Sequence, residues 1–207
     1  QGHLPVGVEV GGQSLPPTPG LHGFAFAELA GDDECEPAIA RTLTALGFHH
    51  AGTHRSKPVQ LWSHGEARVL LNAEPTAHGA AVTALGVEVD DPQAGAERAT
   101  RLLAPVLPRT RGPAEADLSA VPAPDGTAVF FCRTGADDGW LTDFPAHDGA
   151  APAEGSITIT HIDHVALTQP FDNFDETALF YRSVLGLQTQ HASEVAAPFG
   201  LVRNRTV

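Results

Sequence analysis

Two adjoining stretches decide the fold, Ile157-Thr-Ile-Thr-His-Ile-Asp-His-Val-Ala-Leu167 and Phe174-Asp-Glu-Thr-Ala-Leu-Phe-Tyr-Arg-Ser-Val-Leu-Gly186. The first is rich in β-branched residues and alternates apolar with polar side chains, which predicts a strand carrying His164. The second has apolar residues at helical spacing and ends in a Leu-Gly step, which is typical of a helix stop. Asn173 and Glu176 have the spacing of a capping box at its start. We therefore expect a strand followed directly by a helix from about 173 to 185.

The same layout occurs twice earlier in the chain. The first copy has a strand at 23–29, a helix at 32–46, and short strands through 59–62 and 67–72. The second copy has a strand at 80–89, a helix through residue 103, and strands near Leu118 and at 127–132. Phe26 precedes Gly47 by almost the same interval as His164 precedes Gly186, so the first and third copies share a register. Asp32 or Asp33 can cap the first helix, and Asp90-Asp-Pro92 opens the second.

Three copies of one pattern predict an α+β fold of paired βαβββ modules, with three of an expected four units present. One such unit cannot bury its sheet face alone, so paired units curl their sheets around a shared cavity. Residues 1–21 are rich in Gly and Pro and read as a linker or extended lead-in. Residues 22–150 then form an N-terminal module and 151–207 the first half of a second. We expect the fourth unit after Val207.

Composition narrows the partners and the compartment. The chain has 12 basic and 25 acidic residues, a formal net charge of −13, which argues against nucleic acid or an anionic membrane as a partner. We find no signal peptide and no apolar run long enough to span a bilayer. The two cysteines, Cys35 and Cys132, form no CxxC motif, so a cytoplasmic, disulfide-free protein is expected, although the two could pair in principle. Methionine is absent, and we expect this chain to be a piece of a longer polypeptide.

Three segments carry a family resemblance: His54-Arg-Ser-Lys-Pro-Val-Gln-Leu-Trp62, His64-Gly-Glu-Ala-Arg-Val-Leu-Leu-Asn72 and Ile162-Asp-His-Val165. They resemble the vicinal oxygen chelate superfamily, with its glyoxalase-like fold, and within it 4-hydroxyphenylpyruvate dioxygenase. The first two look like the N-terminal module of that enzyme, and the third looks like the start of its catalytic module. The chain resembles even more closely the dioxygenase-like half of bacterial fusion proteins whose other half is a barrel acting as 3-dehydroshikimate dehydratase. Residues 1–20 look like the linker between those halves.

The resemblance implies a metal site. The iron of this family is held by two histidines and one carboxylate, which leaves positions open for a 2-oxo acid and O₂. It assigns the first histidine to His164, and it places the other two ligands in the fourth unit, beyond Val207. Fe(II) or another divalent metal would then bind only with those later ligands. In a strand Ile162, His164 and Ala166 share one face, so we expect His164 to point into the curled sheet. Without the resemblance, a lone strand histidine is more often hydrogen-bonded filler. His161, on the opposite face, has no such support.

The N-terminal module serves as an internal control. The repeat register places Phe26 at the first ligand position, Ala84 at the second and Cys132 at the carboxylate position. These residue types cannot make a two-histidine, one-carboxylate set, so we expect this module to bind no metal and to act structurally. Cys132 is interpreted as a small buried hydrophobic residue.

Other polar groups offer weaker candidates. His49 and His50 point to opposite faces of a strand, so with His54 they make a poor metal site. His54, Arg55 and Lys57 form the chain's basic cluster, which either holds a carboxylate or a partner, or lies solvated on a hairpin, and we favour the solvated hairpin. The remaining charged and aromatic groups are interpreted as a negatively charged helix start (Glu28, Asp32, Asp33, Glu34) and as packing anchors (Trp62, Trp140).

Two functions follow. In the first, the chain is part of a 4-hydroxyphenylpyruvate dioxygenase-like non-haem Fe(II) oxygenase that acts on a 2-oxo acid with an aromatic group. In the second, it is a non-catalytic or accessory domain of a bifunctional 3-dehydroshikimate dehydratase, with a barrel fused upstream. A binding protein of the antibiotic-resistance type is a distant third. We expect a small 2-oxo acid or aromatic acid as the ligand, and homo-oligomerisation remains open. Catalytic residues, substrate and metal identity are left unassigned.

Overall fold

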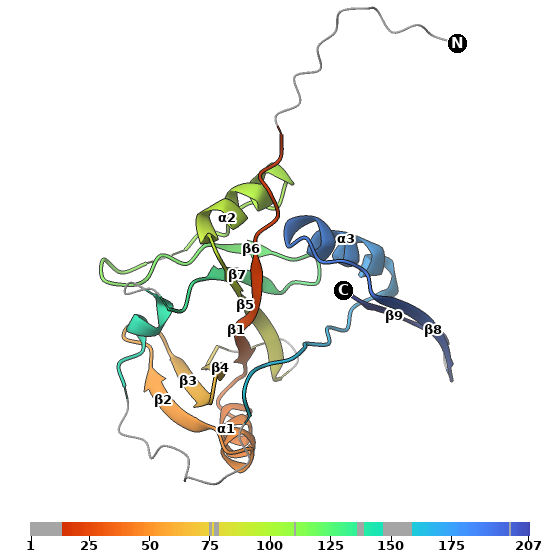
Figure 1. Cartoon of the computed structure of the whole chain (residues 1–207). Coiled ribbons are helices and arrows are strands. Elements are labelled where there is room, and N and C mark those ends of the chain that lie inside the picture. Colours follow the sequence, from red (N-terminus) through yellow and green to blue (C-terminus); the bar gives the residue numbers. More distant parts are fainter. Residues whose placement is uncertain are drawn as a thin grey trace, which may run out of the picture.

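The computed structural model describes residues 14–74, 76, 79–109, 111–135, 139–146, 159–198 and 200–207. The three expected units appear in chain order (Figure 1). The first contains β1 (Leu21–Ala30), α1 (Glu36–Ala45), β2 (His49–Thr53), β3 (Val59–His64) and β4 (Ala67–Asn72). The second contains β5 (Ala81–Val89), α2 (Pro92–Arg101), β6 (Ala120–Pro122), β7 (Ala128–Cys132) and the 3₁₀ helix η1 (Trp140–Asp143). The third contains the 3₁₀ helix η2 (Phe171–Asn173), α3 (Phe174–Val184), β8 (His191–Ala197) and β9 (Gly200–Thr206).

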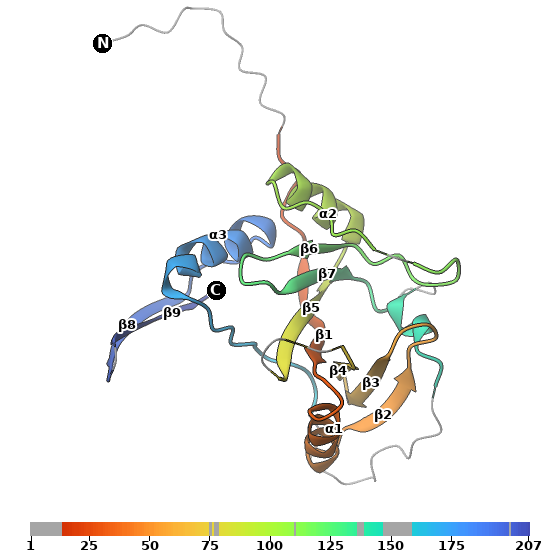
Figure 2. The same ribbon diagram turned by 180° about the vertical axis from the view of Figure 1, so that it is seen from behind.

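The first two units share one seven-stranded sheet in the order β2-β3-β4-β1-β5-β7-β6 (Figure 2). The opening strands β1 and β5 run antiparallel at its centre, where Ala27 faces Leu85. On either side each opening strand pairs in parallel with the closing strand of its own unit, Ala27 with Val69 and Leu85 with Val129. Half a turn about a point between Ala27 and Leu85 therefore exchanges the two units. The predicted α+β fold and internal repeat are confirmed.

The second unit has fewer strands than the predicted βαβββ pattern. Its β6 and β7 correspond to β3 and β4 by their pairing, and no counterpart of β2 occurs in the described residues between α2 and β6. Pro105, Pro108 and Pro113 lie in this connection. Because proline has no N–H to donate to a ladder, three prolines in this short stretch disfavour a strand. The connection therefore crosses as irregular chain.

Helix ends follow local rules, with one exception. Gly47 and Gly186 have φ values of +86° and +75°, so both predicted Leu-Gly stops are confirmed. Asp91 caps α2 by accepting a hydrogen bond from the Ala94 N–H at 3.0 Å. At the other end of α2, Leu103 takes the left-handed conformation with φ +67°, although it is not glycine and is 90% exposed. The exposed leucine is strained there because its Cβ crowds the following carbonyl.

Two predicted caps differ in the structure. Asp32 accepts a hydrogen bond from the Cys35 N–H at 2.9 Å, but it closes the turn before α1, which begins only at Glu36. Asn173 makes no side-chain cap on α3, so the predicted capping box with Glu176 is wrong. Because η2 precedes α3 directly, Asn173 already has helical φ and ψ of −87° and −7°, not the extended backbone of an N-cap.

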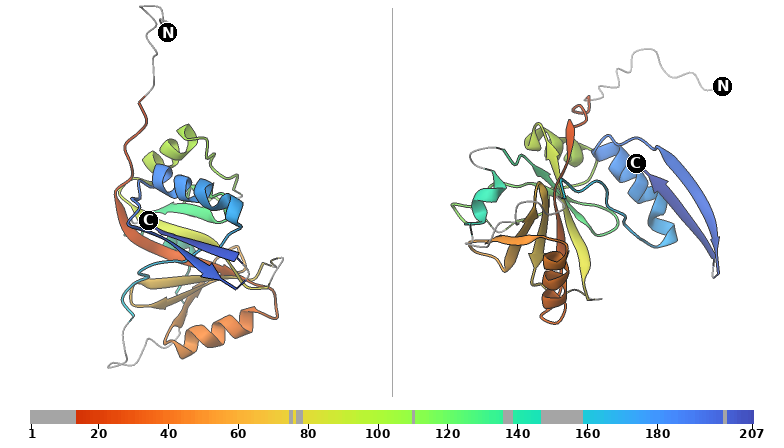
Figure 3. Two further views of the ribbon diagram at one scale, coloured as in Figure 1. Left: turned by 90° about the vertical axis from the view of Figure 1, so that its right-hand side faces the viewer. Right: turned by 60° about the horizontal axis from the view of Figure 1, so that its bottom comes forward.

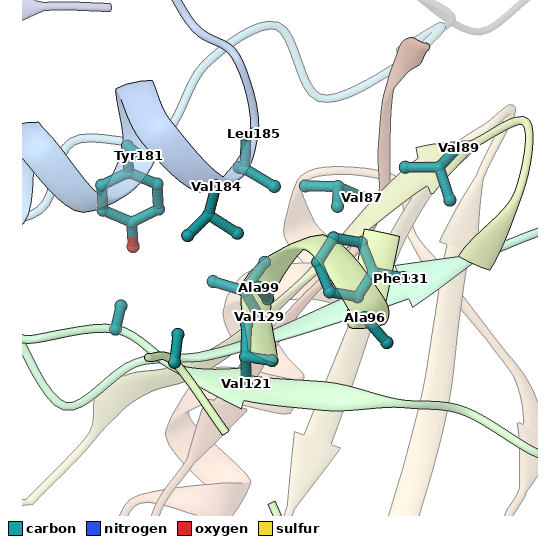
Figure 4. Packing of buried hydrophobic residues seen from close by; sticks show 12 residues of the cluster. Val87, Val89, Ala96, Ala99, Val121, Val129, Phe131, Tyr181, Val184 and Leu185 are labelled. Atoms are coloured by element: carbon teal, nitrogen blue, oxygen red, sulfur yellow. The ribbon is translucent and has the colours of Figure 1, made fainter. Parts of the chain in front are cut away.

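The helices pack on the outer faces of the sheet, at opposite ends of the molecule (Figure 3). At one end α1 packs through Leu43 against Trp62 and Leu71. At the other, α2 and α3 share a core with β5, β6 and β7. Figure 4 shows Tyr181 and Val184 of α3, and Leu185 directly after it, directed towards this core. The core also contains Val87, Ala99, Val121 and Val129. The helices α1 and α2 therefore cover the sheet, and α3 packs against α2 and the β6–β7 end of the same core.

The predicted strand at 157–167 is not formed. Residues 157 and 158 lie outside the described part, and 159–170 have no regular secondary structure. In the first unit the opening strand is held between β4 and β5. The strands in the described part of the third unit are β8 and β9, which pair with each other. A strand without a hydrogen-bonding neighbour on either side has nothing to fix it. Within the described ranges, no helix combines the length and apolarity needed to cross a bilayer.

Candidate functional site

His164 lies on the surface of an extended segment between two cores. Its side chain is 83% exposed, and its Nδ1 lies 2.9 Å from Oδ2 of Asp163. The hydrogen bond with His164 lowers the pKa of the Asp163 carboxyl below its usual value. The expectation that His164 points into a concave sheet is wrong for this structure, because the strand that would orient it is absent.

The segment around His164 is nevertheless anchored. The buried His64 ring lies 3.3 Å from the Leu46 carbonyl through Nδ1 and accepts a hydrogen bond from the Ile159 N–H through Nε2, also at 3.3 Å. The Glu66 N–H donates to the Thr160 carbonyl at 2.9 Å. Ile159 and Ile162 then pack on the α1 core, and Leu167 packs on the α2–α3 core. His164 therefore lies in an extended segment, residues 159–167, that is anchored to the first module at both ends; this segment is called the arch below.

The described residues do not fit an iron ion on their own. A facial triad needs three protein ligands. Across residues 14–146 and 159–207, as far as these are described, no group of three or more His, Cys, Asp and Glu side chains could hold a metal. His49, His50 and His54 accordingly do not gather into a site. The arch supplies one imidazole with an adjacent carboxylate.

The β8–β9 hairpin presents a face of mixed polar and apolar residues that the sequence reasoning missed. Arg203 and Arg205 lie over the Phe174 ring at 4.7 and 5.1 Å, so this face of the hairpin is turned towards α3. Side chains alternate across a strand, so their neighbours face the other way. The cross-strand pairs on that opposite face are His191 with Thr206, Ser193 with Asn204, and Val195 with Val202. Recognising them needed the hairpin register, which the sequence pattern did not supply.

In the first module, the positions that correspond by the repeat to the metal ligands are filled by packed side chains. Phe26, Ala84 and Cys132 lie in one buried cluster, as predicted. Trp140 meets the Phe26 ring edge-on at 5.0 Å between centroids, and Phe144 packs behind it. The interpretations of Cys132 and Trp140 as buried packing residues are confirmed. Burial raises the pKa of the Cys132 thiol far above its usual value, so the thiol stays protonated.

The basic segment at 54–57 is not a solvated hairpin. Arg55 Nε lies 3.6 Å from Asp143, and Lys57 Nζ lies 2.9 Å from Glu115, with both carboxylates almost fully buried. Asp143 also accepts hydrogen bonds from the Ala116 N–H at 3.0 and 3.2 Å. The favoured interpretation was therefore wrong, and the alternative of a bound carboxylate is right, with the carboxylates supplied by the chain itself. Sequence reasoning missed them because Glu115 and Asp143 lie about 60 and 90 residues further on.

This ion cluster shifts the titration of its members. Hydrogen bonds from Ser56 and Lys57 lower the pKa of Glu115 to about 2. Burial, reinforced by the Lys57 charge, lowers the pKa of His54. The cluster ties the β2–β3 turn to the 3₁₀ helix that carries Trp140. The ion pairs therefore help to hold Trp140, and with it the aromatic cluster of Phe26, Trp140 and Phe144, in place.

Comparison with known proteins agrees with this geometry. Residues 17–144, more than half of the chain, match the family model described as hydroxyphenylpyruvate dioxygenase, HPPD, N-terminal. The chain belongs to the hydroxyphenylpyruvate dioxygenase family. Among curated proteins, it is 34% identical over 94% of its length to a 3-dehydroshikimate dehydratase of Pseudomonas putida, of which it covers 32%. It is 33% identical over 54% of its length to a 4-hydroxyphenylpyruvate dioxygenase of Pseudomonas sp., of which it covers 33%.

Solved structures give the same relationship. A xylose isomerase-like TIM barrel/4-hydroxyphenylpyruvate dioxygenase fusion protein matches with a TM-score of 0.76 and 34% identity, over 96% of this chain and 32% of that one. A 4-hydroxymandelate synthase mutant from Streptomyces coelicolor shares the fold with a TM-score of 0.65 and 19% identity, over 92% of this chain and 59% of that one. The family assignment and the glyoxalase-like fold are confirmed. The chain spans about a third of the length of these curated relatives.

Proposed function

We propose that this chain is the hydroxyphenylpyruvate dioxygenase-like part of a bifunctional 3-dehydroshikimate dehydratase of aromatic catabolism, and that it acts there as an accessory module. The observation that carries this proposal is how much of the chain each relative matches, and at what sequence identity. The Pseudomonas putida dehydratase matches 94% of the chain at 34% identity, whereas two Pseudomonas 4-hydroxyphenylpyruvate dioxygenases match 54% at 33% identity and 80% at only 23% identity. The fusion structure pairs the same module with a barrel. In this proposal a fused barrel dehydrates 3-dehydroshikimate to protocatechuate in the cytoplasm.

The filled first module supports a structural role. Phe26, Trp140 and Phe144 pack together in a buried cluster with Ala84 and Cys132, and Arg55 and Lys57 pair with the buried carboxylates of Asp143 and Glu115 beside it. Such a module supplies a rigid scaffold and leaves chemistry to other parts of the protein.

A second candidate is an Fe(II) oxygenase acting on an aromatic 2-oxo acid. The observations that favour it are the family match over residues 17–144 and the anchored segment 159–167, which leaves His164 accessible. In this proposal His164 supplies one of three metal ligands and the other two come from beyond Val207. Iron would serve as the site that binds and activates the 2-oxo acid and O₂.

Two assays on the intact protein separate the candidates. Formation of protocatechuate from 3-dehydroshikimate reports dehydration, and O₂ uptake with 4-hydroxyphenylpyruvate and related 2-oxo acids reports oxygenation. The accessory proposal predicts dehydration without O₂ uptake, unchanged by His164→Ala. The oxygenase candidate predicts O₂ uptake that His164→Ala abolishes. His161→Ala is the matched control, since His161 is an exposed histidine on the same segment. Absence of dehydration would overturn the first proposal.

A further inference from the structure

The lead-in before β1 is stiff and extended. Its described part includes Leu15-Pro-Pro-Thr-Pro-Gly20, in which three of six residues are proline. Proline fixes φ near −65°, and chains rich in it adopt an extended, semi-rigid form. The sequence alone suggested a linker. In the structure this segment runs beside α2 on its way into β1 (Figure 1).

One arginine joins the lead-in to two helices. Arg98 of α2 donates from Nη1 to the Pro16 carbonyl at 2.5 Å. The same guanidinium donates from Nε and Nη2 to the Ser183 carbonyl, in the last turn of α3, at 3.0 and 2.7 Å. The last carbonyls of a helix have no partner within it, so Arg98 satisfies one of these and also carries a favourable charge there. Because the guanidinium is a planar fork, it fixes both carbonyls in one geometry.

Two more contacts hold the same segment. A Cβ placed on Gly186 would lie 2.6 Å from Thr18 Cγ2, so the stop of α3 is in close contact with the lead-in. At the β1 end, the Gly20 carbonyl accepts a hydrogen bond from the Asp90 N–H at 3.2 Å, and His22 Nε2 lies 2.6 Å from Asp90 Oδ1. The lead-in therefore spans from the start of α2 to the end of α3 with an anchor at each.

The helix α3 also contacts the first module through an apolar core. Tyr181, Val184 and Leu185 pack against the α2 core, and the Tyr181 hydroxyl donates to Asp125 Oδ2 at 3.3 Å. Apolar packing is not directional, so it leaves α3 some freedom to slide and turn on this surface. Hydrogen bonds to the end of α3 remove that freedom.

We propose that residues 14–22 form a strap that docks α3, and with it the third unit, on the first module, and that Arg98 is the positioning residue that couples strap and helix. The proposal does not depend on iron or on dehydration. It concerns how the unit that carries His164 is held in place, and it therefore stands or falls apart from the proposed function.

Hydrogen exchange at the Leu185 amide, which donates to the Tyr181 carbonyl at 3.2 Å, tests the coupling. Arg98→Ala should accelerate this exchange about tenfold, the factor expected when a charged hydrogen-bond donor to the helix end is lost. Replacing Pro16, Pro17 and Pro19 together by glycine should accelerate it similarly, because a flexible strap costs more entropy to order. Arg41→Ala, which removes an exposed arginine of α1, is the matched control and should change nothing.

Combining the two changes gives the decisive result. If strap and Arg98 act as one device, the combined variant should exchange no faster than the faster single variant. A multiplicative effect, on the order of a hundredfold, would mean independent contacts and would overturn the coupling. Unchanged exchange in either single variant would overturn it as well. Trp62 and Trp140 both lie in the first module, so unaltered tryptophan fluorescence confirms that the module stays folded in each variant.

Discussion

Removing the Asp143 carboxylate should destabilise the first module more than any exposed ion pair could. The residue is 4% exposed, and its two carboxylate oxygens share one hydrogen bond from the Ala116 N–H, while Arg55 and His54 approach it at 3.6 and 3.9 Å. In Asp143→Ala the Ala116 N–H loses its acceptor and the Arg55 charge loses its buried partner. The space left beside Trp140 cannot be filled without moving the 3₁₀ helix that carries both residues.

The magnitude follows from these contacts. A hydrogen bond to a charged acceptor contributes about 1.5–3 kcal/mol, and leaving one partner of a buried ion pair costs about 3–5 kcal/mol. Arg55 is partly exposed, so water recovers some of that loss. We expect a decrease of about 3 kcal/mol in the free energy of unfolding. With a urea dependence of about 2 kcal/mol per molar, the midpoint should fall by about 1.5 M.

Urea denaturation followed by tryptophan fluorescence measures this change, because Trp140 lies three residues before Asp143. Asp117→Ala is the matched control. Asp117 pairs with Arg111 at 3.1 Å but is 77% exposed, so its loss should cost less than about 0.5 kcal/mol. Equal decreases in the two variants would show that Asp143 contributes no more to stability than an exposed ion pair does.

Three further predictions concern single groups. The pKa of Glu115 is lowered from 4.5 to about 2, so its contribution to stability is present above pH 4.5 and is lost as pH falls towards 2. In Glu115→Gln the urea midpoint should therefore fall less between pH 5 and pH 3 than it does in the unmutated protein. Burial and then Asp125 raise the pKa of Tyr181, the single tyrosine, above its usual 10, so tyrosinate absorbance should appear only above pH 10, and Asp125→Asn should bring it to lower pH. Leu103→Gly should raise the free energy of unfolding by about 1 kcal/mol in thermal denaturation, since glycine adopts φ +67° without strain, and a decrease would contradict the strain.

Local pattern predicted the repeated elements of this fold well. Helical spacing and Leu-Gly stops located α1 and α3 because those signals are local to each helix. The intervals between Phe26, Gly47, His164 and Gly186 revealed the repeat, and the pairing of Ala27 with Leu85 then explains why Phe26 and Ala84 are equivalent. The prediction of an opening strand in the third unit was wrong because a strand needs hydrogen-bonding neighbours, which a local sequence pattern does not report.

The candidate site was less predictable for the same reason. Arg55 and Lys57 looked solvated because their partners, Asp143 and Glu115, come from distant loops that only the folded chain brings together. His164 was identified through a family resemblance. Its side chain is exposed because residues 159–167 have no neighbouring strand to pair with, which the local sequence does not report. The lead-in looked like a linker because proline content reports stiffness without showing what the stiff segment touches.

Iron content of the intact protein decides most directly between the two proposed functions. The accessory proposal predicts that His164→Ala leaves it unchanged, and loss of iron would contradict that proposal and favour the oxygenase candidate. After reconstitution with Fe(II) and removal of free metal, elemental analysis should compare the unmutated protein with His164→Ala and His161→Ala. If His164 is a ligand, as the proposed carry-over from the family requires, His164→Ala should lose the iron of this module while His161→Ala keeps it. Equal iron in all three proteins would contradict the assignment, and the module would then serve the protein through its scaffold alone.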